Sequence, residues 1–125
     1  MRLILLVGAG SFIGGVCRYL LSVFVQQRSG SDFPYGTLLV NLAGCFIIGC
    51  IYGVAEKTQL STETRLLFVT GILGGFTTFS AFSAESFVLI REGHYLTSLS
   101  YILISVVAGI TLTTLGAWIF KVMLR

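Results

Sequence analysis

Charged side chains are scarce in this sequence: 8 lysines and arginines and 5 aspartates and glutamates account for 10% of its 125 residues. A typical soluble domain carries about 25% charged residues. This shortage, together with 55% hydrophobic residues, places the chain among membrane proteins. The net charge of +3 is small and scattered. It does not indicate a nucleic-acid partner, and it fits the excess of Lys and Arg that flanks membrane helices.

Residues that build disulfide frameworks and metal sites are also few. The three cysteines, Cys17, Cys45 and Cys50, all fall in apolar runs, where a free cysteine behaves as a small hydrophobe. One histidine without a Cys/His cluster argues against a transition-metal site. No nucleophile–base pair or acidic dyad stands out, and the glycines of residues 71–75 lack the Lys-Ser/Thr of a phosphate-binding loop. We therefore do not expect an enzyme.

Long apolar runs dominate what is present. About 20 apolar residues cross the roughly 30 Å hydrocarbon core of a bilayer. Four runs qualify as spans, and short polar segments separate them: about 3–24, 37–54, 66–90 and 99–122. The first run lacks a cleavage site followed by a polar region, so we interpret it as a helix and not as a signal peptide. The sequence predicts an all-α membrane protein, a single four-helix domain over residues 1–125.

The third run contains an unusual centre, GILGGFTTFSAFSAE, from Gly71 to Glu85. Glycine lowers helix stability by about 1 kcal/mol relative to alanine, and hydroxyl side chains compete for backbone hydrogen bonds. Non-helical backbone at membrane depth is tolerated only where protein or a water-filled cavity surrounds it. We therefore predict that the third helix breaks in mid-membrane, and that the break faces protein, an ion or a pore.

Small residues and charges bear on assembly. Glycine pairs four residues apart, at 10 and 14 and at 49 and 53, allow close helix approach, either within the chain or between copies. Four short spans enclose little alone, so we expect a homo-oligomer, with a two-fold dimer favoured. The expected side of both termini carries Arg2, Lys57, Arg65, Lys121 and Arg125, and the other side Arg18, Arg28 and Arg91. Five against three is a shallow bias, which does not fix one orientation.

Three polar residues inside the spans are candidates for function. Arg18 either serves a functional site or extends its head group to the nearer interface. Glu85 either lines a vestibule or is the solvated end of its helix. Asn41 either makes an interhelical hydrogen bond or donates to a passing anion.

Phe79 and Phe82 are three residues apart and share a helix face. Such a pair of rings commonly faces lipid or fills space in the protein core. Here the rings alternate with hydroxyls at a glycine-rich site, and the positive edge of a phenyl ring can hold a small anion. Two ring edges with hydroxyl donors would replace the water shell of an anion without binding it too tightly for conduction.

At this point the sequence resembles a known family, the Fluc/CrcB fluoride channels of microorganisms. Three segments carry the resemblance: GSFIGGVCRY in the first span, PYGTLLVNLAG in the second and GGFTTFSAFSAE in the third. The resemblance covers nearly the whole chain. It implies passive export of cytoplasmic fluoride across the bacterial inner membrane, through two pores of an antiparallel, dual-topology homodimer. It also implies a structural sodium ion at the dimer centre.

The same resemblance implies roles for individual residues. Phe79 and Phe82 would coordinate fluoride and Asn41 would line the pore, with Ser80 and Ser83 along or beside the path. Thr113 would extend a polar track in the fourth span, and the main-chain carbonyls of Gly74 and Thr77 would bind sodium. The family usually has threonine where this chain has Ala81, so we expect a lower fluoride rate with selectivity retained.

Two other classes of membrane protein share some of these features. A small proton-coupled multidrug exporter also has four short spans, but it needs an acid embedded in the membrane, and the first three spans lack a central Asp or Glu. A non-transporting assembly subunit would account for the small residues but not for the array of rings and hydroxyls.

Overall fold

The computed structural model describes residues 1–56 and 58–123, so Lys57 and Arg125 of the charge count lie outside it. Four stretches are long and apolar enough to cross a membrane, and the described residues contain no strand. Three of them are single helices: α1 (Arg2–Ser29), α2 (Tyr35–Ala55) and α6 (Tyr95–Met123). The all-α architecture and the four spans are thereby confirmed. Each of the four spans extends beyond its predicted bounds at both ends.

The third span is assembled from four pieces, which together run from Thr62 to Arg91. They are α3 (Thr62–Arg65), the π-helical segment η1 (Leu66–Leu73), α4 (Gly74–Phe76) and α5 (Phe79–Arg91). Between α4 and α5 the backbone of Thr77 and Thr78 is extended. The interruption therefore falls inside the stretch that the sequence singled out.

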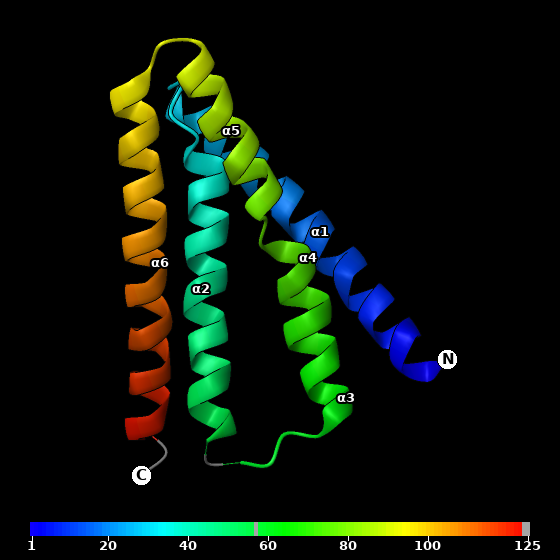
Figure 1. The fold of residues 1–125 in the computed structure, drawn as a ribbon. Helices are drawn as coiled ribbons and strands as arrows, with labels where there is room; N and C mark the ends of the chain where they lie inside the picture. Colours follow the sequence, from blue (N-terminus) through cyan, green and yellow to red (C-terminus); the bar gives the residue numbers. More distant parts are fainter. Residues whose placement is uncertain (57, 124–125) are drawn as a thin grey trace.

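The helices pack as two pairs. Figure 1 shows α2 and α6 side by side, while α1 crosses behind the third span and diverges from α2 toward its N-terminus. In both pairs glycines permit the approach. A Cβ at Gly10 would lie 2.8 Å from the Leu67 carbonyl oxygen, and one at Gly53 would lie 2.5 Å from that of Ala117. Both distances are too short for a real side chain, so these helices contact one another through their backbones.

The glycines of the third span, one of the two reasons for the predicted break, do not interrupt the helix. Gly71, Gly74 and Gly75 all remain helical. A Cβ at Gly71 would lie 3.1 Å from the Gly10 Cα, and one at Gly75 would overlap the backbone of Ser11. These two glycines therefore make room for α1. The chain leaves the helix only at the two threonines that follow.

Ion pairs place the start of α1 and the end of α6 at one end of the bundle. Arg2 at the start of α1 binds Glu63 of α3 at 3.2 Å, and Lys121 near the end of α6 binds Glu56 at 2.6 Å. Both acids flank the connection between the second and third spans, at the lower end of Figure 1. The two pairs are exposed, so each contributes little stability, about 0–1 kcal/mol.

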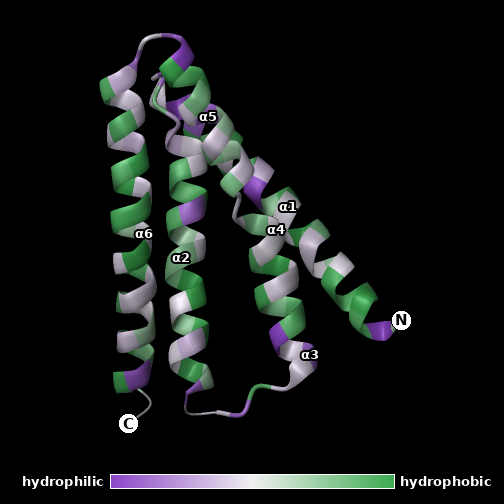
Figure 2. Cartoon of the chain, in the orientation of Figure 1, coloured by the Kyte–Doolittle hydropathy of each residue, from purple (hydrophilic) through white to green (hydrophobic). Residues whose placement is uncertain are grey.

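Few side chains are buried within one copy of the chain. The largest fully buried ones are Tyr101, Val40 and Ser98. Hydrophobic residues cover much of the length of every span, and hydrophilic ones are more frequent at the helix ends and loops (Figure 2). Apolar outer faces of this kind suit contact with lipid. The protein is a multi-pass membrane protein.

Candidate functional site

Thr77 and Thr78 build the break in the third span. Thr77 ends α4: its backbone N–H and its hydroxyl both donate to the Leu73 carbonyl, each at 2.9 Å. Thr78 begins α5: its hydroxyl accepts from the Ala81 N–H at 3.2 Å as an N-cap. Threonine is well suited to both tasks because its hydroxyl can bond to nearby backbone groups. The sequence thus specifies where one helix stops and the next one starts.

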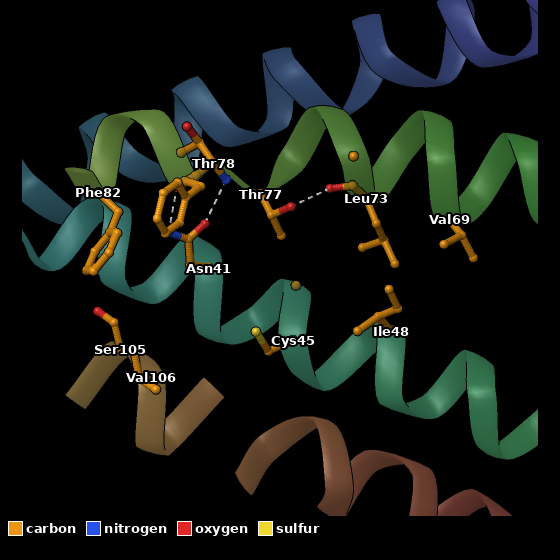
Figure 3. Close-up of a pocket in the computed structure, with 13 residues that line it drawn as sticks. Asn41, Cys45, Ile48, Val69, Leu73, Thr77, Thr78, Phe82, Ser105 and Val106 are labelled. Atoms are coloured by element: carbon orange, nitrogen blue, oxygen red, sulfur yellow. Dashed lines mark hydrogen bonds between the residues drawn. The ribbon is translucent and has the colours of Figure 1, made fainter. Parts of the chain in front are cut away.

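Asn41 of α2 holds this break from the side. Its Nδ2 donates to the Thr78 carbonyl at 3.0 Å, and its Oδ1 accepts from the Thr78 N–H at 2.8 Å (Figure 3). The orientation of the amide follows from chemistry, since a backbone N–H can only donate and a carbonyl can only accept. One Nδ2 hydrogen remains for another acceptor.

At the break, main-chain carbonyls lose their helical donors, among them those of Gly74 and Thr77. In a continuous helix the Gly74 carbonyl would accept from the Thr78 N–H, and the Thr77 carbonyl from the Ala81 N–H. Here the Thr78 N–H donates to Asn41 and the Ala81 N–H to the Thr78 hydroxyl. Two of the carbonyls that lose their helical donors at the break belong to the two residues named for sodium.

A cavity of about 410 Å³ adjoins the break. At one end it is lined by polar and aromatic side chains, among them Asn41, Thr78, Phe82 and Ser105, and at the other by aliphatic ones such as Ile48 and Val69 (Figure 3). Its walls come from α2, α6 and every piece of the third span except α3. Three spans therefore meet at this cavity.

Both predicted rings line the same cavity. Their centroids are 5.5 Å apart and their planes are inclined by 48°. Phe82 is half-buried and packs on Tyr101, with centroids 5.2 Å apart. Phe79 is 79% exposed, so this copy of the chain does not cover it. Phe82 is thus held in place, and Phe79 is available to another molecule.

A second cavity, of about 560 Å³, contains the two charged candidates. Arg18 and Glu85 line it together with Ser80 and Ala81. Glu85 accepts from the Thr37 hydroxyl at 2.6 Å and from the Tyr101 hydroxyl at 2.7 Å. Its carboxylate is therefore anchored within the protein and is not simply the solvated end of a helix.

Thr78 lines both cavities, which places the break between them. Ala81 lines only the second cavity, whereas Phe79 and Phe82 line only the first. The sequence predicts residue 81 between the rings. The structure instead places Ala81 in the second cavity, which Arg18 also lines, because successive residues of a helix point in different directions.

Two of the site residues predicted from the sequence line neither of these two cavities. Ser83 is exposed and lines neither cavity. The Thr113 hydroxyl lies 3.0 Å from the carbonyl oxygens of Cys45 and Gly109, in a neighbouring cavity between α2 and α6. That neighbouring cavity shares Cys45, Ser105 and Val106 with the one at the rings.

Sequence reasoning missed Tyr101 and Ser105 in the fourth span. Tyr101 is fully buried against Phe82 and Glu85, and the Ser105 hydroxyl is buried without a hydrogen-bond partner among the described residues. The two are four residues apart, on one face of α6. That spacing of polar groups inside an apolar run was a usable signal.

Known proteins similar to this chain indicate the family to which it belongs. The family model described as CrcB-like protein, Camphor Resistance (CrcB), matches residues 5–117. A protein of Phocaeicola vulgatus is 41% identical over 118 residues, covering 94% of this chain and 98% of the relative. A second, from Rhizobium meliloti, is 47% identical over 107 residues, 85% of this chain and 86% of the relative. Each bears the name fluoride-specific ion channel FluC.

A relative from Roseiflexus carries the same name and is 44% identical over 121 residues, 96% of this chain and 98% of its own length. The match therefore extends across all four spans and is not confined to the motif at the break. The chain belongs to the CrcB family of fluoride-specific ion channels, as its resemblance to that family indicated.

Proposed function

We propose that this protein is a fluoride-selective channel that exports fluoride from the cytoplasm by passive permeation and so lowers its toxicity. One observation carries the proposal: Phe79, Phe82 and Asn41 line one cavity beside a helix break. The curated relatives that match nearly the whole chain are named fluoride-specific ion channels. The proton-coupled exporter receives no support from these names.

The chemistry of the cavity suits fluoride. Fluoride is small and strongly hydrated, so a selective path must replace its water shell with several modest donors. Ring edges of Phe79 and Phe82, one Nδ2 hydrogen of Asn41 and the Ser105 hydroxyl are donors of this kind. None of these groups carries a full positive charge, so the ion is not held too tightly to leave.

The cavity beside Arg18 is proposed as the vestibule of this path. Arg18 attracts anions there, and Ser80 provides a hydroxyl on the way to the break. Glu85 is tied to Thr37 and Tyr101, so its charge is partly offset by two donated hydrogen bonds. The polar track is proposed to continue past Ser105 toward Thr113.

The working unit is proposed to be an antiparallel homodimer with two pores. Phe79 is largely exposed in one copy, although it belongs to the array that carries the function. A second copy would cover this ring and complete the wall of the cavity. The shallow charge bias allows copies to insert in opposite orientations, with the break of each third span in mid-membrane.

A sodium ion is proposed to stabilise the centre of the dimer. Oxygen ligands suit a hard monovalent cation, and the Gly74 and Thr77 carbonyls have lost their helical donors. Sodium would supply positive charge and hold the two breaks together. Replacing sodium by a bulky organic cation should lower the melting temperature of the purified dimer. An unchanged melting temperature would contradict a stabilising role for sodium.

The function is tested by efflux from liposomes that contain only this protein. A fluoride electrode should record rapid fluoride release without a proton gradient, while chloride release stays near that of protein-free vesicles. Equal fluoride and chloride rates would refute a selective channel. Release only under a proton gradient would favour the exporter instead.

A further inference from the structure

We infer that Asn41 is a positioning residue, which holds the backbone of the break and sets where the ring-bearing helix α5 begins. The inference extends the proposed function, because it assigns Asn41 a task that does not require contact with fluoride. It rests on the two hydrogen bonds of the Asn41 amide to the backbone of Thr78, at 2.8 and 3.0 Å.

The amide of Asn41 replaces what the helix loses at the break. Thr78 is the extended N-cap of α5, so its N–H cannot donate to the preceding helical turn. An N–H left unpaired in a dry site would cost about as much as a lost hydrogen bond, and the C=O gains a further donor from Asn41. Asn41 pairs both groups with one side chain, as a neighbouring strand would.

The position of Thr78 determines the position of both rings. Thr78 is the N-cap of α5, and Phe79 is the first residue of that helix. Phe82 follows one turn later. A shift of Thr78 would therefore move both rings relative to α2 and α6, which form the other walls of the cavity.

Phe79 has little else to hold it, because it is 79% exposed. The upstream piece is fixed separately, through the bonds of Thr77 to the Leu73 carbonyl. Asn41 is therefore the side chain that ties the start of α5 to α2. Its spare Nδ2 hydrogen remains available to meet the ion, so the two tasks must be separated by experiment.

The substitution Asn41→Asp separates the task of holding the backbone from the task of meeting the ion. When the introduced carboxyl group is protonated, it offers one O–H to the Thr78 carbonyl and one C=O to the Thr78 N–H, and so restores both backbone bonds. It retains no further donor for an anion. When the group is deprotonated, it can only accept, and it repels the Thr78 carbonyl. Burial raises the pKa of a carboxyl group, so the pH range from about 8 to about 5 is suitable.

The experiment uses the full-length protein in liposomes and measures two quantities. The first is fluoride flux. The second is hydrogen–deuterium exchange at the Thr78 amide, followed by mass spectrometry. The unaltered protein at each pH controls for the nearby titratable groups Glu85 on α5, Tyr101 on α6 and Cys45 on α2, and for the charge of Arg18 on α1. Protein-free vesicles at each pH control for leakage of neutral hydrogen fluoride.

With Asn41→Asp we expect flux to fall at least about tenfold at pH 8 and to return to within about threefold of the unaltered protein at pH 5. Protection of the Thr78 amide should recover over the same pH range. Asn41→Leu, which keeps the bulk and removes both bonds, should lose protection and flux at every pH.

Two outcomes would overturn the inference. Normal protection at Thr78 in Asn41→Leu would mean that the amide does not hold the break. Recovered protection without recovered flux in Asn41→Asp would mean that the spare hydrogen on the ion's path is what matters. If the unaltered protein conducts no fluoride, the proposed function fails, while exchange at Thr78 still decides whether Asn41 holds the break.

Discussion

At the scale of single residues, the two rings occupy different environments. Phe82 is half-buried on Tyr101, whereas Phe79 is largely exposed. The same substitution therefore has different structural costs at the two positions. This difference separates effects on permeation from effects on stability.

Replacing Phe79 by isoleucine should reduce fluoride flux by at least about tenfold and leave the melting temperature nearly unchanged. The ring edge is lost, but little packing within the chain is lost with it. Phe82→Ile should reduce flux similarly and also destabilise the protein by about 1 kcal/mol, since it removes contact with Tyr101. Liposome efflux and thermal denaturation in detergent measure the two effects. Normal flux in both variants would mean that the two rings contribute only to packing and not to permeation.

Ala81→Thr adds a hydroxyl to the cavity beside Arg18 and Ser80. A further donor at this point should raise the fluoride rate about two- to fivefold, because an anion entering the break sheds water there. Selectivity over chloride should not change, since Ala81 does not line the cavity of the rings. The comparison needs fluoride and chloride efflux from matched liposomes. An unchanged or slower fluoride rate would show that residue 81 does not face the ion's path.

At the scale of helices, the third span depends on close contact with α1. A Cβ at Gly14 would overlap the Ile72 carbonyl oxygen. The atom that it meets belongs to the backbone, which cannot move aside as a flexible side chain would. The π-helical segment η1 lies against α1 in this region and leads directly into α4 and the break. Displacing it would disturb the break from the upstream side.

Gly14→Ala should therefore destabilise the protein by about 1–3 kcal/mol and reduce flux. Gly8→Ala is the matched control, because it lies on the same helix and a Cβ there meets nothing within 4 Å. The control should be neutral or slightly stabilising, since alanine favours helix over glycine. Thermal denaturation of both variants provides the comparison. Equal melting temperatures would mean that α1 can move away from the third span at little cost.

At the scale of the whole molecule, one copy of the chain leaves large apolar surfaces uncovered. Exposed large side chains occur on every span, for example Phe12, Leu39, Phe87 and Trp118. Lipid can cover most of them, and the proposed second copy would cover Phe79 beside the cavity.

We expect copies to insert in both orientations. A small tag at the C-terminus should be accessible from both sides of the membrane in intact cells and in permeabilised controls. Adding two lysines to the connection between α2 and α3 should bias insertion to one orientation and lower flux, because antiparallel dimers become rare. A tag accessible from one side only, in the unaltered protein, would exclude dual topology.

The sequence by itself determined the features that depend on composition and on local chemistry. Four spans followed from long apolar runs, and the approximate place of the break followed from a cluster of hydroxyls next to glycines. The rings and Asn41 were also named as candidates in this way. Their chemistry is a property of each residue and its near neighbours, which a sequence displays directly.

Tertiary structure alone decided which distant residues share a wall. Tyr101 lies against Phe82 and Glu85, and Ala81 lines a cavity with Arg18 instead of lying between the rings. It also decided that Gly71 and Gly75 admit α1 while the chain breaks at the threonines. Such relations depend on how each helix is rotated about its axis. Packing against its neighbours sets that rotation, and hydrophobic periodicity gives no guide to it in spans that are apolar on every face.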